Sequence, residues 1–233
     1  SMGLALANIN SNTPDPSGGK IRRYKNSSEP NGVFEEAAAY PVQQLAMSAY
    51  KDPIGSVKKA MEIYASHGIT TAQDGASSPE AIALMQAADD QGMVNLDIIS
   101  YPVGQNGLDK SIQTIRFGSY KGRVKVGGIK LILDGSPQGK TAYLTEPYYK
   151  PPHSESDSYK GYPLIPQKEV SKWVSIYADL NIPIMAHANG DAAADMLIKA
   201  VESADMKNDH RTIMIHAQTV REDQLDQMKK LKI

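Results

Sequence analysis

Residues 182–216 read IPIMAHANGDAAADMLIKAVESADMKNDHRTIMIH, an apolar run followed by an amphipathic stretch and a second apolar run. The apolar runs at 182–186 and 212–215 have the length of buried strands, and residues 191–204 have the spacing of a helix. This order predicts two parallel strands joined by a right-handed crossover. Such a unit is typical of doubly wound sheets and of (β/α)₈ barrels.

The same alternation continues toward the N-terminus. Three more apolar strands are predicted at 69–72, 96–101 and 126–133. Three further helices are expected to begin at the polar caps Ser56, Ser78 and Thr219. Two more helices are expected at 109–117 and 167–180. Five strands are fewer than the eight of a closed barrel, so an incomplete barrel is expected.

Two regions lack this alternation. Residues 1–54 contain turn-rich segments and are expected to form an insertion or prefix segment, followed by a partial (β/α) barrel at 55–233. Within the barrel, residues 135–165 hold several Pro, Gly and Tyr with little periodicity, which predicts a long loop over one end of the sheet. The loop tyrosines either line a pocket or pin the loop to the rim, and the sequence favours neither.

The composition excludes several classes of function. The 25 basic and 26 acidic residues leave a net charge of -1, which indicates neither a nucleic-acid nor an anionic-membrane partner. The absence of cysteine excludes disulfides, zinc ribbons and thiol nucleophiles, so a metal site needs His, Asp, Glu or a modified Lys. No apolar run approaches the roughly 20 residues that cross a bilayer, and the N-terminus lacks signal-peptide zones. We therefore expect a cytoplasmic protein that acts on a small-molecule substrate.

Two of the five histidines end neighbouring predicted strands at equivalent points. His187 follows the run at 182–186, and His216 follows the run at 212–215. Because adjacent parallel strands lie about 4.8 Å apart, the two imidazoles can converge on one ion such as Zn²⁺. The alternative is that each histidine packs at its strand end and hydrogen-bonds a loop carbonyl.

Lys130 lies inside the apolar strand predicted at 126–133. A buried ammonium is unfavourable unless it is paired, deprotonated or modified. The alternative is an edge-strand lysine that reaches solvent. Tyr101 and Asp134 end predicted strands, on the side of the sheet where both candidate folds place the active site. For Asp134, helix capping is the alternative.

Residues 135–141 read GSPQGKT after a predicted strand and are similar to a Walker A loop. That pattern requires four residues between its glycines, whereas this segment has three. The segment therefore gives no support to a nucleotide-binding domain.

Four strings together resemble successive signatures of a known family: GITTAQD at 68–74, IKLILDGS at 129–136, HANGDAA at 187–193 and HAQ at 216–218. The family is the amidohydrolase superfamily, in the branch called amidohydrolase family 3, which includes N-substituted formamide deformylase-like enzymes. The prefix also resembles that branch's insertion before its second barrel strand. The resemblance implies a (β/α)₈ TIM-barrel metallohydrolase, of which this chain covers about strands 2 to 6.

The resemblance also implies that Lys130, His187 and His216 are metal ligands and catalytic residues. Lys130 takes the place of a lysine that is often carboxylated in the superfamily, and one or two divalent ions, expected to be zinc, are implied. The superfamily's His-x-His of strand 1 and aspartate after strand 8 have no counterpart in this sequence. Three residues at or after strand ends are expected to contact the substrate: Asp134, Tyr101 and Gln218.

The activity implied by the resemblance is that of a metal-dependent hydrolase of amide or other carbon–nitrogen bonds other than peptide bonds. In such enzymes a metal-activated water attacks the carbonyl carbon. The alternative is a non-catalytic amidohydrolase-like binding or regulatory domain that lacks a complete metal site. Unpaired strand edges and half-covered apolar faces further predict a homo-oligomer or a domain-swapped association.

Overall fold

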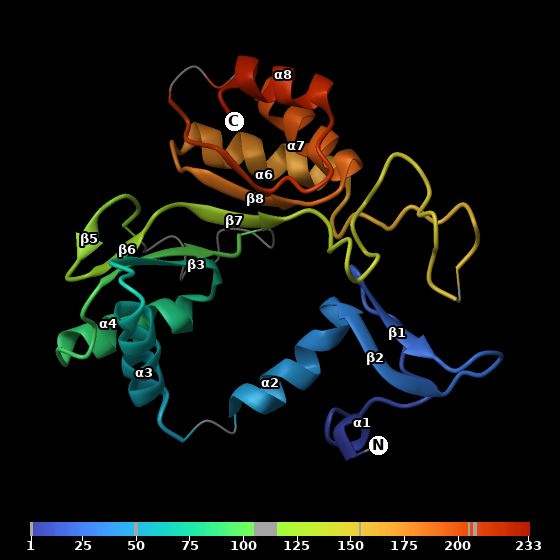
Figure 1. Ribbon diagram of the computed structural model, residues 1–233, viewed down its shortest axis with the longest axis horizontal. Helices are drawn as coiled ribbons and strands as arrows, with labels where there is room; N and C mark the ends of the chain where they lie inside the picture. The colour runs from blue at the N-terminus through green and yellow to red at the C-terminus, as the bar shows by residue number, and fades with distance from the viewer. Residues whose placement is uncertain (1, 49–50, 105–115, 154, 205, 207–208) are drawn as a thin grey trace.

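The computed structural model describes residues 2–48, 51–104, 116–153, 155–204, 206 and 209–233. An N-terminal hairpin is followed by strands that alternate with helices (Figure 1). In chain order the elements are α1 (Met2–Leu6), β1 (Gly19–Arg23), β2 (Pro30–Glu36), η1 (Ala37–Ala39), α2 (Tyr40–Ser48), α3 (Pro53–Ser66), β3 (Thr71–Ser77), α4 (Pro79–Asp90), β4 (Asp97–Pro102), β5 (Tyr120–Lys121), β6 (Val124–Val126), β7 (Ile129–Ile132), α6 (Gln167–Asp179), β8 (Ile184–Ala188), α7 (Asp191–Ser203), β9 (Ile213–His216) and α8 (Glu222–Leu231).

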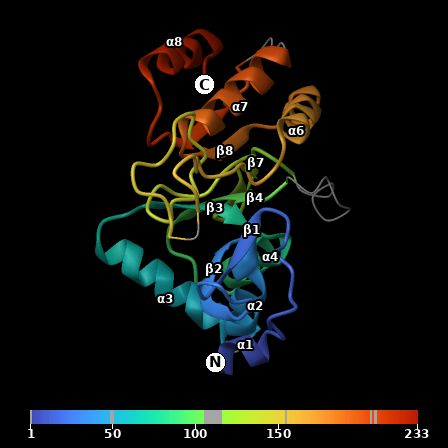
Figure 2. The ribbon, with the colours of Figure 1, turned by 90° about the vertical axis from the view of Figure 1, so that its right-hand side faces the viewer.

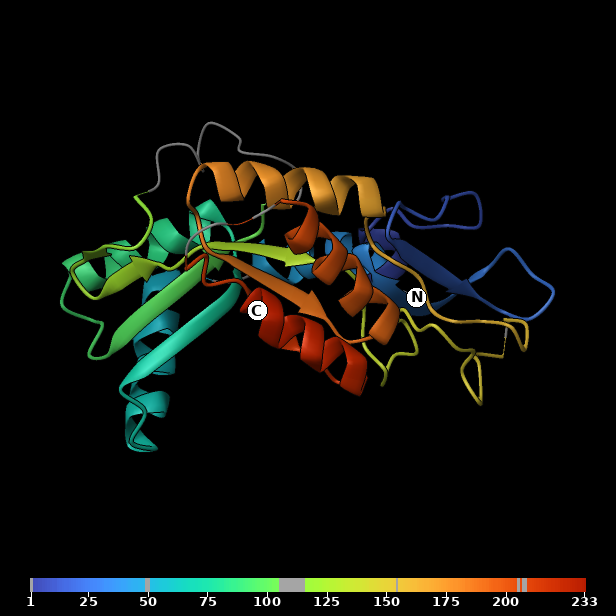
Figure 3. The same ribbon diagram turned by 90° about the horizontal axis from the view of Figure 1, so that it is seen from above.

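Parallel strands form the centre of the fold (Figures 1 and 3). β3, β4 and β6 pair in parallel, as do β7, β8 and β9, while the short β5 is antiparallel to β6. The two groups meet where Val103 bridges Lys130 and the Gly104 amide donates to the Lys130 carbonyl oxygen at 3.0 Å. Apart from β5, which lies on the far side of β6, the order of the strands in space follows their order in the chain. Within the described residues the strands do not close into a barrel.

β6 and β7 occupy the region where one strand, 126–133, is predicted. β6 pairs with β4, whereas β7 pairs with β8. Gly127 and Gly128 lie between them, and a Cβ atom on Gly128 would lie 2.2 Å from the carbonyl oxygen of Pro183. Only glycine fits where the chain passes so close to another backbone. This passage places Lys130 between two neighbouring strands.

Helices cover one face of these strands. α6 and α7 pack on β7 and β8 around Ile129, Leu131 and Ala186, and α3 and α4 pack around Ile98 and Val124. In Figure 1, α6, α7 and α8 lie above the strands, while α3 and α4 lie below. The sheet is curved between these two groups of helices, as in part of a barrel wall.

The opposite side of the strands is called the inner face here. Side chains alternate along a strand. Ile129 and Leu131 are buried under the helices, so Lys130 points to the inner face. The same alternation directs His187, between the buried Ala186 and Ala188, to that face.

Most predicted strands and helices are confirmed, with changes at their ends. The strand predicted at 69–72 is shifted to Thr71–Ser77, because Gly68 and the next two residues connect it to α3. Ser78 caps α4 as predicted, and its Oγ accepts from the Ala81 amide at 3.1 Å. The helix predicted at 109–117 lies almost entirely outside the described residues.

Two predicted caps are wrong. Asp52 instead of Ser56 caps α3, and its Oδ1 accepts from the Gly55 amide at 2.8 Å. Thr219 does not cap α8, because its hydroxyl donates to the Asn189 carbonyl oxygen at 3.0 Å. A neighbouring polar residue, Asp52, supplies the cap of α3. At α8 the first residue before the helix is Arg221, whose backbone amide donates to Gln224 Oε1 at 3.0 Å.

The hairpin β1–β2 lies next to the segment that connects β7 to α6 (Figures 1 and 2). Glu155 of this segment forms ion pairs with Lys20 at 2.6 Å and with Arg22 at 2.8 Å. Two tyrosine hydroxyls bond carbonyl oxygens within the same segment, that of Tyr148 at 2.9 Å and that of Tyr159 at 2.8 Å. These two tyrosines therefore hold the segment to itself, and neither bond reaches the strands of the barrel wall.

No helix in the described part of the chain is both long enough and apolar enough to cross a membrane.

Candidate metal centre

Lys130 lies on β7 with only 4% of its surface exposed. Since β7 pairs with β8 and touches the end of β4, the alternative of an edge-strand lysine is wrong. Among the described residues its ammonium has no hydrogen-bond or ion-pair partner. Burial lowers its pKa from 10.5 to about 8. About a tenth of this lysine is therefore an unprotonated amine at pH 7, far more than for a lysine with its ordinary pKa.

His187 lies one residue before the end of β8 and is held through one ring nitrogen. Its Nε2 atom lies 2.8 Å from the Gly135 carbonyl oxygen. Because a carbonyl oxygen only accepts, the contact with Gly135 requires a proton on Nε2. Asn189 Nδ2 lies 3.1 Å from the same ring nitrogen, but it already donates to the Gly135 carbonyl oxygen at 2.7 Å, so the shorter contact of His187 decides the tautomer. The neutral ring then keeps its lone pair on Nδ1, an arrangement typical of histidines that bind metals.

His216 meets His187 at the end of β9. The ring centroids are 4.5 Å apart and the planes are inclined by 76°. His216 pairs in register with Ala188, which packs under the helices, so a regular strand would direct its side chain away from the inner face. The backbone is left-handed at His216 (φ 77°) and at Ala217 (φ 48°) instead. This unfavourable conformation, costing about 1–2 kcal/mol per residue, accompanies the approach of the two rings.

His216 keeps an exposed surface at the end of β9. Its pKa is lowered from the usual 6.5, first by its partial burial and then by the nearby charges of His187 and Lys130. Asp134 acts in the opposite direction. His187, Lys130 and Asp134 are therefore close enough to His216 to influence its protonation. In the described part of the chain, neither His216 nitrogen has a hydrogen-bond partner.

Asp134 is fully buried and holds backbone amides. Its Oδ1 accepts from the Asn189 amide at 2.9 Å, and its Oδ2 accepts from the amides of Gly190 at 2.8 Å and Tyr143 at 2.9 Å. The Asp134 side chain has no exposed surface, and its Oδ1 atom also lies 3.4 Å from His187 Nε2. Asp134 joins the segment after β7 to the turn after β8, on which His187 depends.

The other two predicted substrate contacts differ in exposure. Tyr101 is buried on the inner face of β4, against Gly127, and burial raises the pKa of its hydroxyl. Gln218 is exposed two residues after His216. Of the three expected residues, Gln218 is therefore the one whose side chain is at the surface.

Asn189 was not predicted as part of the site. Its Nδ2 donates to the Gly135 carbonyl oxygen at 2.7 Å, so two donors, from His187 and Asn189, share this acceptor. Its own buried Oδ1 has no hydrogen-bond partner among the described residues. The string HANGDAA contains the residue, but periodicity alone gives it no role.

Lys130, His187 and His216 fit a divalent ion by the chemistry of their donors. The two rings keep unshared lone pairs, and Lys130 is buried without a partner. The described residues contain no cluster of three or more His, Cys, Asp or Glu side chains able to hold a metal. Since zinc sites use about four ligands, these three residues would supply only part of a coordination shell.

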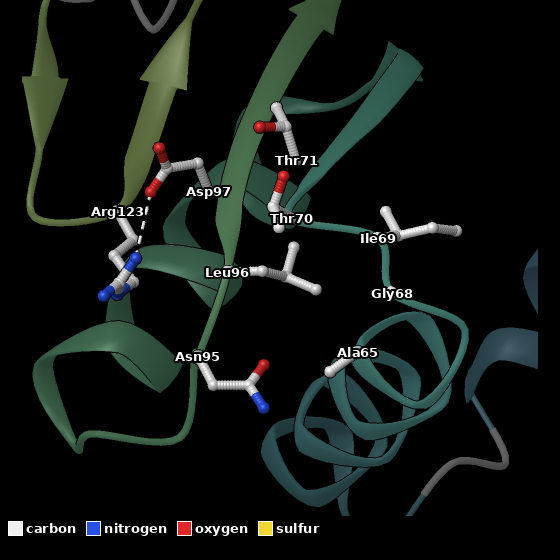
Figure 4. A pocket seen from close by; sticks show the side chains of 9 residues that line it. All are labelled: Ala65, Gly68, Ile69, Thr70, Thr71, Asn95, Leu96, Asp97 and Arg123. Atoms are coloured by element: carbon white, nitrogen blue, oxygen red, sulfur yellow. Dashed lines mark hydrogen bonds and ion pairs between the residues drawn. The ribbon is translucent and has the colours of Figure 1, made fainter.

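Two cavities lie away from this group. A cleft of about 910 Å³ separates the hairpin from the segment after β7, and Lys25, Lys140 and His153 are among its lining residues. A pocket of about 450 Å³ lies where β3 and β4 begin, and Arg123 pairs with Asp97 at 3.1 Å in its wall (Figure 4). The second pocket is therefore at the end of the strands opposite to His187 and His216.

The family model described as "Amidohydrolase family" (Amidohydro_3) matches residues 1–233. The chain belongs to the amidohydrolase family. The predicted branch, family 3, is thereby confirmed. This amidohydrolase chain is 26% identical over 247 residues to "Putative amidohydrolase YtcJ" of Bacillus subtilis (strain 168), covering 100% of the chain and 44% of that protein.

The chain also matches part of two other proteins. The chain is 25% identical to "Protein LONG AFTER FAR-RED 3" of Arabidopsis thaliana, covering 94% of the chain and 39% of that protein. Its fold resembles that of an uncharacterized metal-dependent hydrolase from Pyrococcus furiosus, with a TM-score of 0.71, 23% identity, and 100% and 46% of the two chains covered. The amidohydrolase chain thus spans less than half the length of these relatives.

Proposed function

We propose that this amidohydrolase chain contributes Lys130, His187 and His216 to the metal site of a hydrolase that cleaves amide or other carbon–nitrogen bonds in a small molecule. The observation that carries the proposal is the hydrogen bond of His187 Nε2 to the Gly135 carbonyl oxygen, beside the ring of His216. It leaves the Nδ1 lone pair of His187 available to a metal. The solved metal-dependent hydrolase with a similar fold supports the proposal.

A divalent ion, which we propose to be zinc, would supply Lewis-acid chemistry that activates water and polarises a carbonyl group. The chain's own residues prepare this site by their protonation states. The lowered pKa of His216 favours its unprotonated ring, which has a nitrogen lone pair available to a metal. The Gly135 carbonyl fixes the tautomer of His187 in the same sense.

Lys130 is proposed to act as a carboxylated lysine. Its pKa of about 8 provides an unprotonated amine. The amine nitrogen forms a bond to the carbon of CO₂ and releases one proton, which gives a carbamate with anionic oxygen donors. This modification replaces a buried ammonium without a partner by a metal ligand.

The rival function is a non-catalytic amidohydrolase-like domain. Metal analysis of the full-length protein and of His187→Ala and His216→Ala separates the two. We expect both variants to lose bound metal and turnover, while His67→Ala, at the exposed end of α3, keeps them. Unchanged metal content and turnover in His187→Ala and His216→Ala would refute the metal site and leave the rival function.

A further inference from the structure

A chain of hydrogen bonds runs from the N-terminal hairpin to the ring of His187. Glu36, the last residue of β2, accepts from the Thr141 hydroxyl at 2.7 Å. The Thr141 carbonyl oxygen accepts from the Gly135 amide at 3.2 Å. Gly135 in turn bonds His187 Nε2 through its own carbonyl oxygen. The hairpin is thereby connected to a residue 151 positions further along the chain.

The Thr141 hydroxyl has a defined direction in this chain. A hydroxyl has one proton to donate, and Thr141 donates it to Glu36. Its oxygen then accepts from the Ser136 amide at 3.0 Å. Thr141 is buried, so water does not replace either partner. Glu36 therefore determines how Thr141 holds the backbone next to Gly135.

Glu36 and Thr141 also fill the space beside Gly135. A Cβ atom on Gly135 would lie 2.0 Å from Thr141 Oγ1 and 2.4 Å from Glu36 Oε1. These side chains limit the movement of the peptide that carries the carbonyl oxygen. Glu36 adopts a left-handed backbone (φ 48°), a conformation that persists only where the surrounding structure holds it.

We propose that Glu36 is a positioning residue for the His187 imidazole and acts through Thr141 and the Gly135 carbonyl group. The inference rests on the proposed function of His187 as a metal ligand. The partner of the second ring nitrogen fixes the tautomer and orientation of a metal-binding histidine. The hairpin of the N-terminal segment is thus a functional part of the site.

A control variant is needed that weakens the attachment of the hairpin without changing the hydrogen bonds that lead to His187. Glu155 pairs with Lys20 and Arg22 of β1 and joins the hairpin to the same segment. Glu155→Gln weakens this attachment and leaves the bonds among Glu36, Thr141 and Gly135 intact. If Glu36 only attached the hairpin to the rest of the chain, Glu155→Gln and the variants of Glu36 would change the His187 ring equally.

The first measurement is the imidazole nitrogen spectrum of metal-free, full-length protein labelled with ¹⁵N-histidine. The His187 signals are assigned by their loss in His187→Gln. We expect one Nε2-protonated tautomer in the native protein and a mixture in Glu36→Ala and Thr141→Val. Glu36→Gln and Thr141→Ser, which keep the acceptor and the hydroxyl, should restore the native signals, and Glu155→Gln should not change them.

The second measurement is Zn²⁺ affinity by competition with a chromophoric chelator. We expect affinity about 10- to 100-fold weaker in Glu36→Ala and Thr141→Val, and within about twofold of native in Glu155→Gln. Absence of Zn²⁺ binding in the native protein would contradict the proposed function, whereas the tautomer measurement would still test Glu36. Native tautomer signals in folded Glu36→Ala, or an equal effect of Glu155→Gln, would overturn the positioning role. If Thr141→Val does not fold, the comparison of Glu36→Ala with Glu36→Gln decides.

Discussion

The rings of His187 and His216 meet edge to face, although the two residues lie on different strands and at different registers. His216 pairs with Ala188, one position beyond His187. The left-handed backbone at His216 compensates for this offset. Protonating both rings at this distance would bring two positive charges together, which agrees with the lowered pKa of His216.

The metal-free protein should lose stability as the pH falls below about 6.5, the usual pKa of histidine. The folded state holds the pKa of His216 below the unfolded value, so the unfolded state binds more protons in this window. Urea unfolding at pH 7 and pH 5.5 measures the effect. His216→Gln should lose less stability between the two pH values than the native protein. An equal loss in both proteins would show that His216 does not contribute.

Lys130→Met should stabilise the metal-free protein at pH 7, because it replaces a buried ammonium with an apolar side chain of similar length. The advantage should shrink as the pH rises. The pKa of Lys130 is about 8 in the folded protein against its ordinary value of 10.5, so native stability increases between these values. Roughly 2 kcal/mol of the difference should disappear between pH 7 and pH 10.

Denaturant unfolding of both proteins across this range checks the prediction. Lys125→Met, on the half-buried neighbouring β6, is the control and should show no comparable dependence on pH. A constant difference between native protein and Lys130→Met would mean that Lys130 titrates as in the unfolded chain.

Ala217→Gly should raise the free energy of unfolding by about 1 kcal/mol, since glycine adopts the left-handed backbone at this position without a Cβ clash. Ala178→Gly within α6 is the control, and it should lower stability by about 0.5–1 kcal/mol. Thermal or urea unfolding distinguishes the two signs. A loss of stability in Ala217→Gly would show that the left-handed conformation is not the unfavourable one.

The 233-residue chain should self-associate in solution. β3 and β9 each have one side without a strand partner in the described residues, and Ile213 on β9 is 41% exposed. Unpaired strand edges favour pairing with another copy. Light scattering should therefore give a mass of at least twice 25.3 kDa, and Ile213→Lys should lower it. A monodisperse monomer would contradict this expectation.

The strands of the fold could be predicted because burial on the helix-covered face leaves apolar runs in the sequence, as at Ile129–Ile132 and Ile184–Ala188. The separation of β6 from β7 could not be predicted in the same way. It depends on the approach of Gly128 to Pro183, which lies 55 positions further along the chain. Close backbone approaches between distant segments leave only a glycine as their signal.

The candidate site was likewise predictable only in part. His187 and His216 were found because strand ends gather at one edge of a parallel sheet. The partners of Asp134 could not be predicted, because they are backbone amides, which almost every residue carries. Glu36 was overlooked for a related reason, since nothing near it in the sequence points to Thr141.

The contact between Glu36 and Thr141 also has a consequence for biosynthesis. The two residues are 105 positions apart, so the hairpin leaves the ribosome well before its partner exists. At an elongation rate of about 5–20 residues per second, that interval lasts on the order of several seconds. During this time nothing from Thr141 holds Glu36 in its left-handed conformation, so the hairpin completes its folding late although it is synthesised before Thr141.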